Sequence, residues 1–78
     1  MPRYFFHLYD TMAVVDEEGT ELPDPEAARA KALRDARTMA CAEVLEGRLT
    51  LSHRIEVADC RGDVLLTVAF GDSVDVED

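Results

Sequence analysis

The stretch DPEAARAKALRDARTMACAEVLEG, residues 24–47, predicts the one long helix around which the rest of the chain is organised. Asp24 can accept the free N–H groups of a first helical turn, and Pro25 suits the first helical position because it has no N–H to leave unpaired. Glu26 adds a negative charge at the positive end of the helix dipole. No Gly or Pro interrupts residues 26–46. Gly47 is the expected stop, because glycine adopts the left-handed conformation at little cost.

A stripe of mostly small apolar residues runs along one side of this helix. At about 100° per residue, it comprises Ala28, Ala32, Leu33, Ala36, Met39, Ala40 and Val44. Because alanine is so common in it, the helix is expected to lie close against a sheet. Glu43 falls near the middle of the stripe and leaves two interpretations open. Either it reaches solvent from a frayed helix end, or it is buried and paired with His53 or Arg54.

Alternating apolar residues predict β-strands before and after this helix. Residues 3–9 are rich in aromatic side chains, which favour strands, and residues 12–15 form a shorter apolar run. Residues 53–58 and 64–70 alternate in the same way and are separated by a turn at 59–63. These last two runs therefore predict a hairpin.

The apolar sides of these strands can all face the helix stripe. The residues assigned to that side are Tyr4, Phe6, Leu8, Ile55, Val57, Leu66, Val68 and Phe70. One helix on one side of an antiparallel sheet is the economical packing for such a set. The sequence thus predicts an α+β fold in a β-β-α-β-β order, with one long helix on a three- or four-stranded sheet. Residues 1–71 are expected to form this single domain, followed by an acidic, frayed tail at 72–78.

The other side of the predicted sheet carries apolar side chains that no helix covers. They are Phe5, Tyr9, Leu65 and Ala69, and exposed apolar patches of this kind usually mark contacts. A chain of 78 residues also buries only a small core, so it gains little stability from its own packing. We therefore expect a homodimer, formed through this side of the sheet or through an exposed strand edge.

Acidic residues are concentrated in two segments. The chain has a formal net charge of −9, with six acids among residues 1–24 and four among residues 71–78. Such a surface repels phosphate backbones, so no direct binding of nucleic acid is expected. No segment resembles a signal peptide, and the apolar runs are far shorter than the roughly 18 residues of a membrane span. We expect no membrane contact and a cytoplasmic location.

Residues 16–24 predict an irregular acidic loop with Leu22 tucked against the helix. Its spacing does not fit an EF-hand, because Gly19 as the central glycine would put Val14 and Pro25 at ligand positions. Weak binding of a divalent cation by the clustered carboxylates stays open as an alternative.

Cysteine, histidine and serine residues form no recognisable site. Cys41, His53 and Cys60 are too few and too widely spaced for a zinc centre, and two cysteines without a secretory signal are expected to be reduced. Ser52, Cys41, His7 and His53 offer nucleophiles or bases but no catalytic pattern. The chain is therefore expected to need no cofactor or metal and not to be an enzyme.

Two kinds of function fit these features. The first is a non-enzymatic protein-interaction or self-associating module, based on the uncovered side of the sheet. The second is a small antitoxin-like or regulatory protein that acts with nucleic-acid machinery, based on a basic stripe of Lys31, Arg34 and Arg37 on the helix. Asp35 lies beside that stripe and offsets part of its charge, so the first function is preferred.

Two motifs also carry a family resemblance. The start MPRYFFHL, residues 1–8, and the stretch DEEGTELPD, residues 16–24, precede an Ala/Arg-rich helix and a final hairpin. Together they resemble a family of small stand-alone bacterial proteins catalogued as a domain of unknown function. The resemblance extends to about Val74. It implies the α+β fold and a bacterial cytoplasmic setting, and it assigns no activity, cofactor or site residue.

Overall fold

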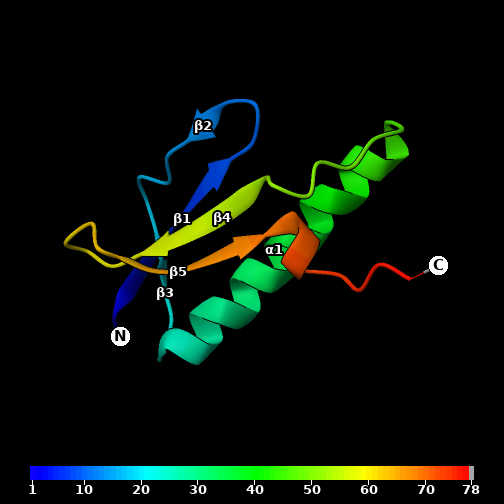
Figure 1. Ribbon diagram of the computed structural model, residues 1–78. Coiled ribbons are helices and arrows are strands. Elements are labelled where there is room, and N and C mark those ends of the chain that lie inside the picture. Colours follow the sequence, from blue (N-terminus) through cyan, green and yellow to red (C-terminus); the bar gives the residue numbers. More distant parts are fainter. Residues whose placement is uncertain (78) are drawn as a thin grey trace.

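The computed structural model describes residues 1–77 and has the predicted α+β architecture, with one helix on one side of an antiparallel sheet (Figure 1). In chain order the elements are β1 (Arg3–Tyr9), β2 (Ala13–Val14), β3 (Thr20–Glu21), α1 (Pro25–Leu45), β4 (Arg54–Ala58), β5 (Val64–Ala69) and a 3-10 turn, η1 (Phe70–Asp72). The sheet order is β2-β1-β4-β5, and β3 also pairs with β1. β1 is therefore central, and β5 forms an edge.

Helix α1 begins and ends where the sequence predicts. Asp24 is the N-cap, and its Oδ1 accepts the N–H of Ala27 at 2.9 Å. At the other end, Gly47 has a φ of 90° and donates its N–H to the carbonyl of Val44 at 2.9 Å. Only glycine adopts this φ without strain, so the helix stops there.

The predicted strand count was wrong by one, because β3 lies in the segment predicted to be an irregular loop. Thr20 and Glu21 pair with Tyr4 and Arg3 of β1. The Arg3 guanidinium fixes this pairing, since it donates to the carbonyl of Glu18 at 2.8 Å and lies 3.2 Å from the Glu21 carboxylate. A two-residue strand has no alternating pattern of its own, so β3 could not be recognised from the sequence.

The core lies between α1 and the predicted side of the sheet. Its buried residues are Tyr4, Ala28, Ala32, Ala36, Ala40, Ile55, Val57, Val68 and Phe70, and Phe6, Leu8, Leu22, Leu33, Met39 and Leu66 pack against them. The four buried alanines confirm the close approach of helix and sheet. Val44, predicted to belong to the stripe, is 57% exposed. Figure 1 explains the error, because the last turns of α1 run past the strands.

The chain remains packed for a few residues after β5. Gly71 donates its N–H to the carbonyl of Leu51 at 3.0 Å, and Ser73 is 1% exposed. The Arg37 side chain donates from Nε to the Ser73 carbonyl at 2.6 Å and so ties this segment to α1. Val76 is exposed. The predicted tail at 72–78 includes Asp78, which lies outside the described residues.

Candidate functional site

The four residues predicted for self-association lie on the side of the sheet opposite α1 but do not form one patch. Phe5 is paired with Ala58, whereas Tyr9 and Ala69 flank Arg54 at the other end of the strands. Leu65 lies near the Ala58 end, where the register of β4 and β5 is irregular. A polar row separates the two ends, made of His7, Glu56 and Thr67 on three adjacent strands.

Two of these residues are also partly covered by the chain itself. The Arg54 guanidinium lies over the Tyr9 ring, 4.7 Å from its centroid, and is held by Glu56 at 3.1 Å. The Phe5 ring packs under Gly19, where an added Cβ would come within 2.9 Å of the Phe5 Cε2 atom. Gly19 has a φ of 72°, so this close approach and the backbone conformation both require glycine. Leu65, which is 47% exposed, is the most open of the four.

A single carboxylate completes the outer edge of β1, part of which is paired with β2 and β3. Between β2 and β3, Asp16 Oδ2 accepts the N–H of Phe6 at 3.1 Å, while Oδ1 accepts the N–H groups of Glu18 and Gly19. Burial alone would raise the pKa of Asp16. The three backbone hydrogen bonds and the nearby His7 have a larger, opposite effect, so the pKa lies below its ordinary value of 3.8. The acidic segment is thus anchored by its first residue.

His7 is part of the same anchor. Its Nδ1 accepts the N–H of Asp16 at 3.1 Å, so in this arrangement the ring proton of a neutral His7 is on Nε2. The imidazole therefore serves to position the segment that covers β1.

The opposite edge of the sheet is open. Within residues 1–77, β5 pairs only with β4. The N–H of Phe70 donates to the carbonyl of His53 at 2.7 Å, and antiparallel strands alternate the direction of their backbone groups. Ala69 and Thr67 consequently direct their N–H and C=O groups away from β4. The strand sequence VLLTVA contains no charged residue and no proline that would protect this edge.

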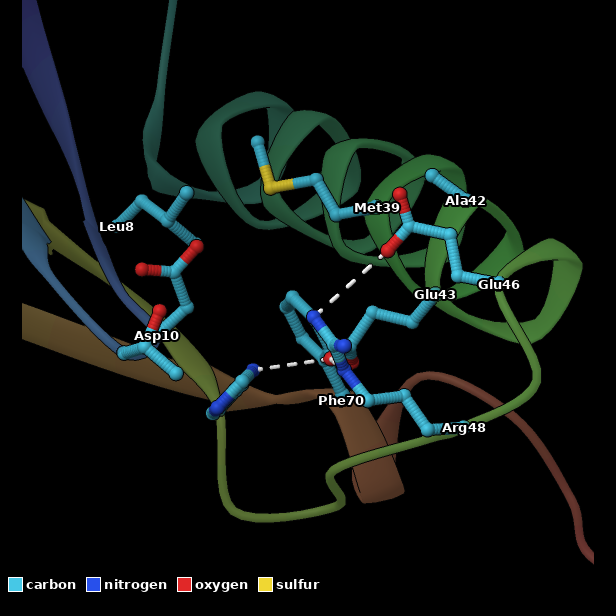
Figure 2. A pocket seen from close by; sticks show the side chains of 10 residues that line it. Leu8, Asp10, Met39, Ala42, Glu43, Glu46, Arg48 and Phe70 are labelled. Atoms are coloured by element: carbon cyan, nitrogen blue, oxygen red, sulfur yellow. Dashed lines mark ion pairs between the residues drawn. The ribbon is translucent and has the colours of Figure 1, made fainter.

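A pocket of about 250 Å³ lies between the C-terminal half of α1 and the end of β1. Figure 2 shows Leu8 and Asp10 on one side of its opening and Met39, Glu43 and Glu46 on the other. Glu43 is largely buried, with its side chain 12% exposed, and its Oε2 lies 3.4 Å from Nδ1 of His53. Of the two interpretations for Glu43, burial beside His53 is therefore confirmed, and exposure to solvent is wrong.

Arg48 belongs to the same pocket, although no sequence pattern indicated this. Its guanidinium lies 3.8 Å from Glu43 and 3.7 Å from Glu46. Glu43 also accepts the N–H of Thr50 through Oε1 at 3.3 Å. This carboxylate therefore holds the loop after α1 in place, a role that depends on where the loop returns rather than on residue spacing.

The other residues considered for chemistry are not gathered into a site. Cys41 and Cys60 are both free and exposed. Among residues 1–77, no three His, Cys, Asp or Glu side chains are arranged to hold a metal ion. Two cations of the basic stripe on α1 form contacts within the chain. Lys31 pairs with Asp35 at 2.6 Å and lies over the Phe6 ring, and Arg37 donates to the Ser73 carbonyl. In the same part of the chain, no helix combines the length and apolar character required to cross a bilayer.

The chain belongs to a defined family of small domains. Residues 3–71 match the family described as Domain of unknown function (DUF6894), and the chain belongs to that family. The match covers every strand and the helix. No curated protein and no solved structure matches the chain.

Proposed function

We propose that this protein is a non-enzymatic interaction module that associates with a second copy of itself along the open edge of β5. The observation that carries the proposal is the contrast between the two edges of the sheet. The β1 edge is closed by β2, β3 and the Asp16 carboxylate. Among residues 1–77, no strand pairs with the outer edge of β5, and β5 itself carries no charge.

Pairing of two β5 strands would provide hydrogen-bond partners for the outward backbone groups of this edge. A second copy related by a two-fold axis would place the strands antiparallel, and each would satisfy outward N–H and C=O groups of the other. Val64 and Leu65 are 53% and 47% exposed, so apolar side chains would be buried at the same time. The edge is preferred over the side of the sheet because Glu56 places a charge in the middle of that side and Arg54 covers Tyr9 at one end of it.

The net negative charge opposes association, but most of it lies outside β5. Each chain carries −9, and its acids are concentrated before residue 25 and after residue 70. Physiological salt screens exposed charges separated by more than about 8 Å. The uncharged strand therefore offers the contact with the least repulsion. The same proposal places the protein in the bacterial cytoplasm, as its sequence resemblance implies, and gives the basic residues of α1 no role in binding nucleic acid.

Sedimentation at micromolar concentration tests the proposal with Thr67→Pro. Proline has no N–H, and the N–H of Thr67 points away from β4, so the sheet within one chain keeps its hydrogen bonds. We expect the wild type and the matched control Thr67→Val to be dimers and Thr67→Pro to be a folded monomer by circular dichroism. A monomeric wild type overturns the proposal. If the dimer persists in Thr67→Pro but is lost in Leu65→Glu, the interface lies on the side of the sheet opposite α1 and not on the β5 edge.

A further inference from the structure

The helix side of the sheet retains a groove that α1 does not fill. The pocket beside Glu43 and a second hollow of about 450 Å³ share Leu8 and Met39 in their linings. The second hollow is also lined by Phe6, Val14 and Val15. The two hollows together form what we call the Leu8–Met39 groove, which runs between α1 and the β1–β2 hairpin.

The floor and one wall of this groove are apolar and accessible. Phe6, Leu8 and Met39 pack against the core from its edge and remain partly exposed. Val14 and Val15 are 55% and 61% exposed. An apolar side chain placed between this wall and α1 would remove both surfaces from water, which stabilises the contact by roughly 25 cal/mol per Å² of apolar area.

The rim of the groove is negatively charged and partly uncompensated. The two linings contain six acidic residues and a single arginine. Arg48 is paired with Glu43 and Glu46, and Asp16 is held by backbone N–H groups. Within residues 1–77, Asp10, Glu17 and Glu18 form no ion pair. The rim therefore favours a cationic occupant.

We propose that the Leu8–Met39 groove binds a basic amphipathic helix of a partner protein, with its apolar side on Leu8 and Met39 and its Lys or Arg residues beside Asp10, Glu17 and Glu18. A helix satisfies its own backbone hydrogen bonds. An added strand would find little edge here, since β1 is closed and β2 has two residues. Anionic lipids, nucleic acids and a second copy of this acidic chain would all be repelled by the rim.

A synthetic probe tests this proposal. The probe is a peptide of about 15 residues with Leu at positions i, i+3, i+4 and i+7 and Lys elsewhere. A peptide with Glu in place of every Lys, and one with the same composition but the Leu positions scrambled, serve as controls. We expect saturable binding of the first peptide only, measured by fluorescence anisotropy. Amide shifts in nuclear magnetic resonance spectra are expected around Leu8, Val15 and Met39.

Matched variants separate the groove from general charge attraction. Glu17→Lys with Glu18→Lys changes the rim, whereas Asp75→Lys with Glu77→Lys makes the same change of charge in the exposed tail. We expect the rim pair to weaken binding about tenfold or more, and the tail pair to have a much smaller effect. Val15→Ser tests the apolar wall and is expected to weaken binding, whereas Val64→Ser on β5 is not.

Equal weakening by the rim and tail pairs would overturn the proposal, as would shifts centred on β5 or an absence of saturable binding. All variants are checked for native circular dichroism. The measurements are repeated with Thr67→Pro, so that the result does not depend on self-association.

Discussion

Oε2 of Glu43 lies 3.4 Å from Nδ1 of His53, and this contact joins the last turns of α1 to the residue that precedes β4. The His53 Nδ1 atom is buried and, within residues 1–77, has no hydrogen-bond partner. The same carboxylate accepts the N–H of Thr50. A residue on the apolar side of the helix thus positions the return loop, whose Arg48 and His53 line the pocket in Figure 2.

Replacement of Glu43 is expected to destabilise the protein. Glu43→Ala removes the acceptor of the Thr50 N–H, and a buried polar group left without a partner costs about 1–3 kcal/mol. The matched control is Glu46→Ala, since Glu46 is exposed and, within residues 1–77, pairs only with Arg48. Urea denaturation should show a lower free energy of unfolding for the first variant and little change for the second. Equal effects would show that the Glu43 contacts contribute nothing specific.

Asp16 is expected to make stability depend on pH in the acid range. Its pKa in the folded protein is lowered below the ordinary 3.8 because backbone hydrogen bonds and His7 outweigh the opposing effect of burial. The folded state therefore holds fewer protons than the unfolded state, and stability is lost as pH falls from the ordinary pKa through the folded one. Asp16→Asn should make the free energy of unfolding depend less on pH between about pH 5 and pH 2, as measured by denaturation at each pH.

The remaining acid dependence in Asp16→Asn should come in part from Asp59, whose pKa is also lowered. Burial opposes this shift, while hydrogen bonds from the N–H groups of Asp63 and Arg61 and the Arg61 charge produce it. Asp59→Asn therefore serves as the comparison. An Asp16→Asn protein that is as acid-sensitive as the wild type would show that the Asp16 hydrogen bonds do not persist in solution.

The exposed acids of the same segment are expected to be replaceable. Glu17 and Glu18 are exposed, and the Glu21 pair with Arg3 is solvent-accessible on both sides. Surface changes of this kind usually alter stability by no more than about 0.5 kcal/mol. The triple change of Glu17, Glu18 and Glu21 to Gln should leave the melting temperature within a few degrees of wild type. A collapse of the melting temperature would reveal a structural or cation-binding role for these carboxylates.

The buried alanines of α1 are expected not to tolerate larger side chains. Ala36 and Ala40 are 0% and 4% exposed and lie where the helix contacts β4 and β5. Ala36→Leu should cost about 1–3 kcal/mol through overpacking. Ala30→Leu, on the exposed side of the same helix, is the control and should cost little. Wild-type stability of Ala36→Leu by thermal denaturation would contradict the observed helix orientation.

Several features of this protein were determined by the sequence alone, because local rules act on neighbouring residues. Asp24 and Gly47 set the ends of α1 through capping and backbone conformation. The alternation of Tyr4, Phe6 and Leu8 fixed which side of β1 faces the helix, because a strand exposes successive side chains on opposite sides. The alanine spacing fixed the helix side that packs on the sheet.

Tertiary structure decided the features that join residues distant in the chain. β3 exists because Arg3 and β1 hold Thr20 and Glu21, and Glu43 is buried because the loop returns to place His53 beside it. The open edge of β5 depends on the strand order, which alternation cannot specify. The single patch expected from Phe5, Tyr9, Leu65 and Ala69 is divided because the register places His7, Glu56 and Thr67 between its ends. Periodicity fixes the direction of a side chain, but only pairing across strands fixes its neighbours.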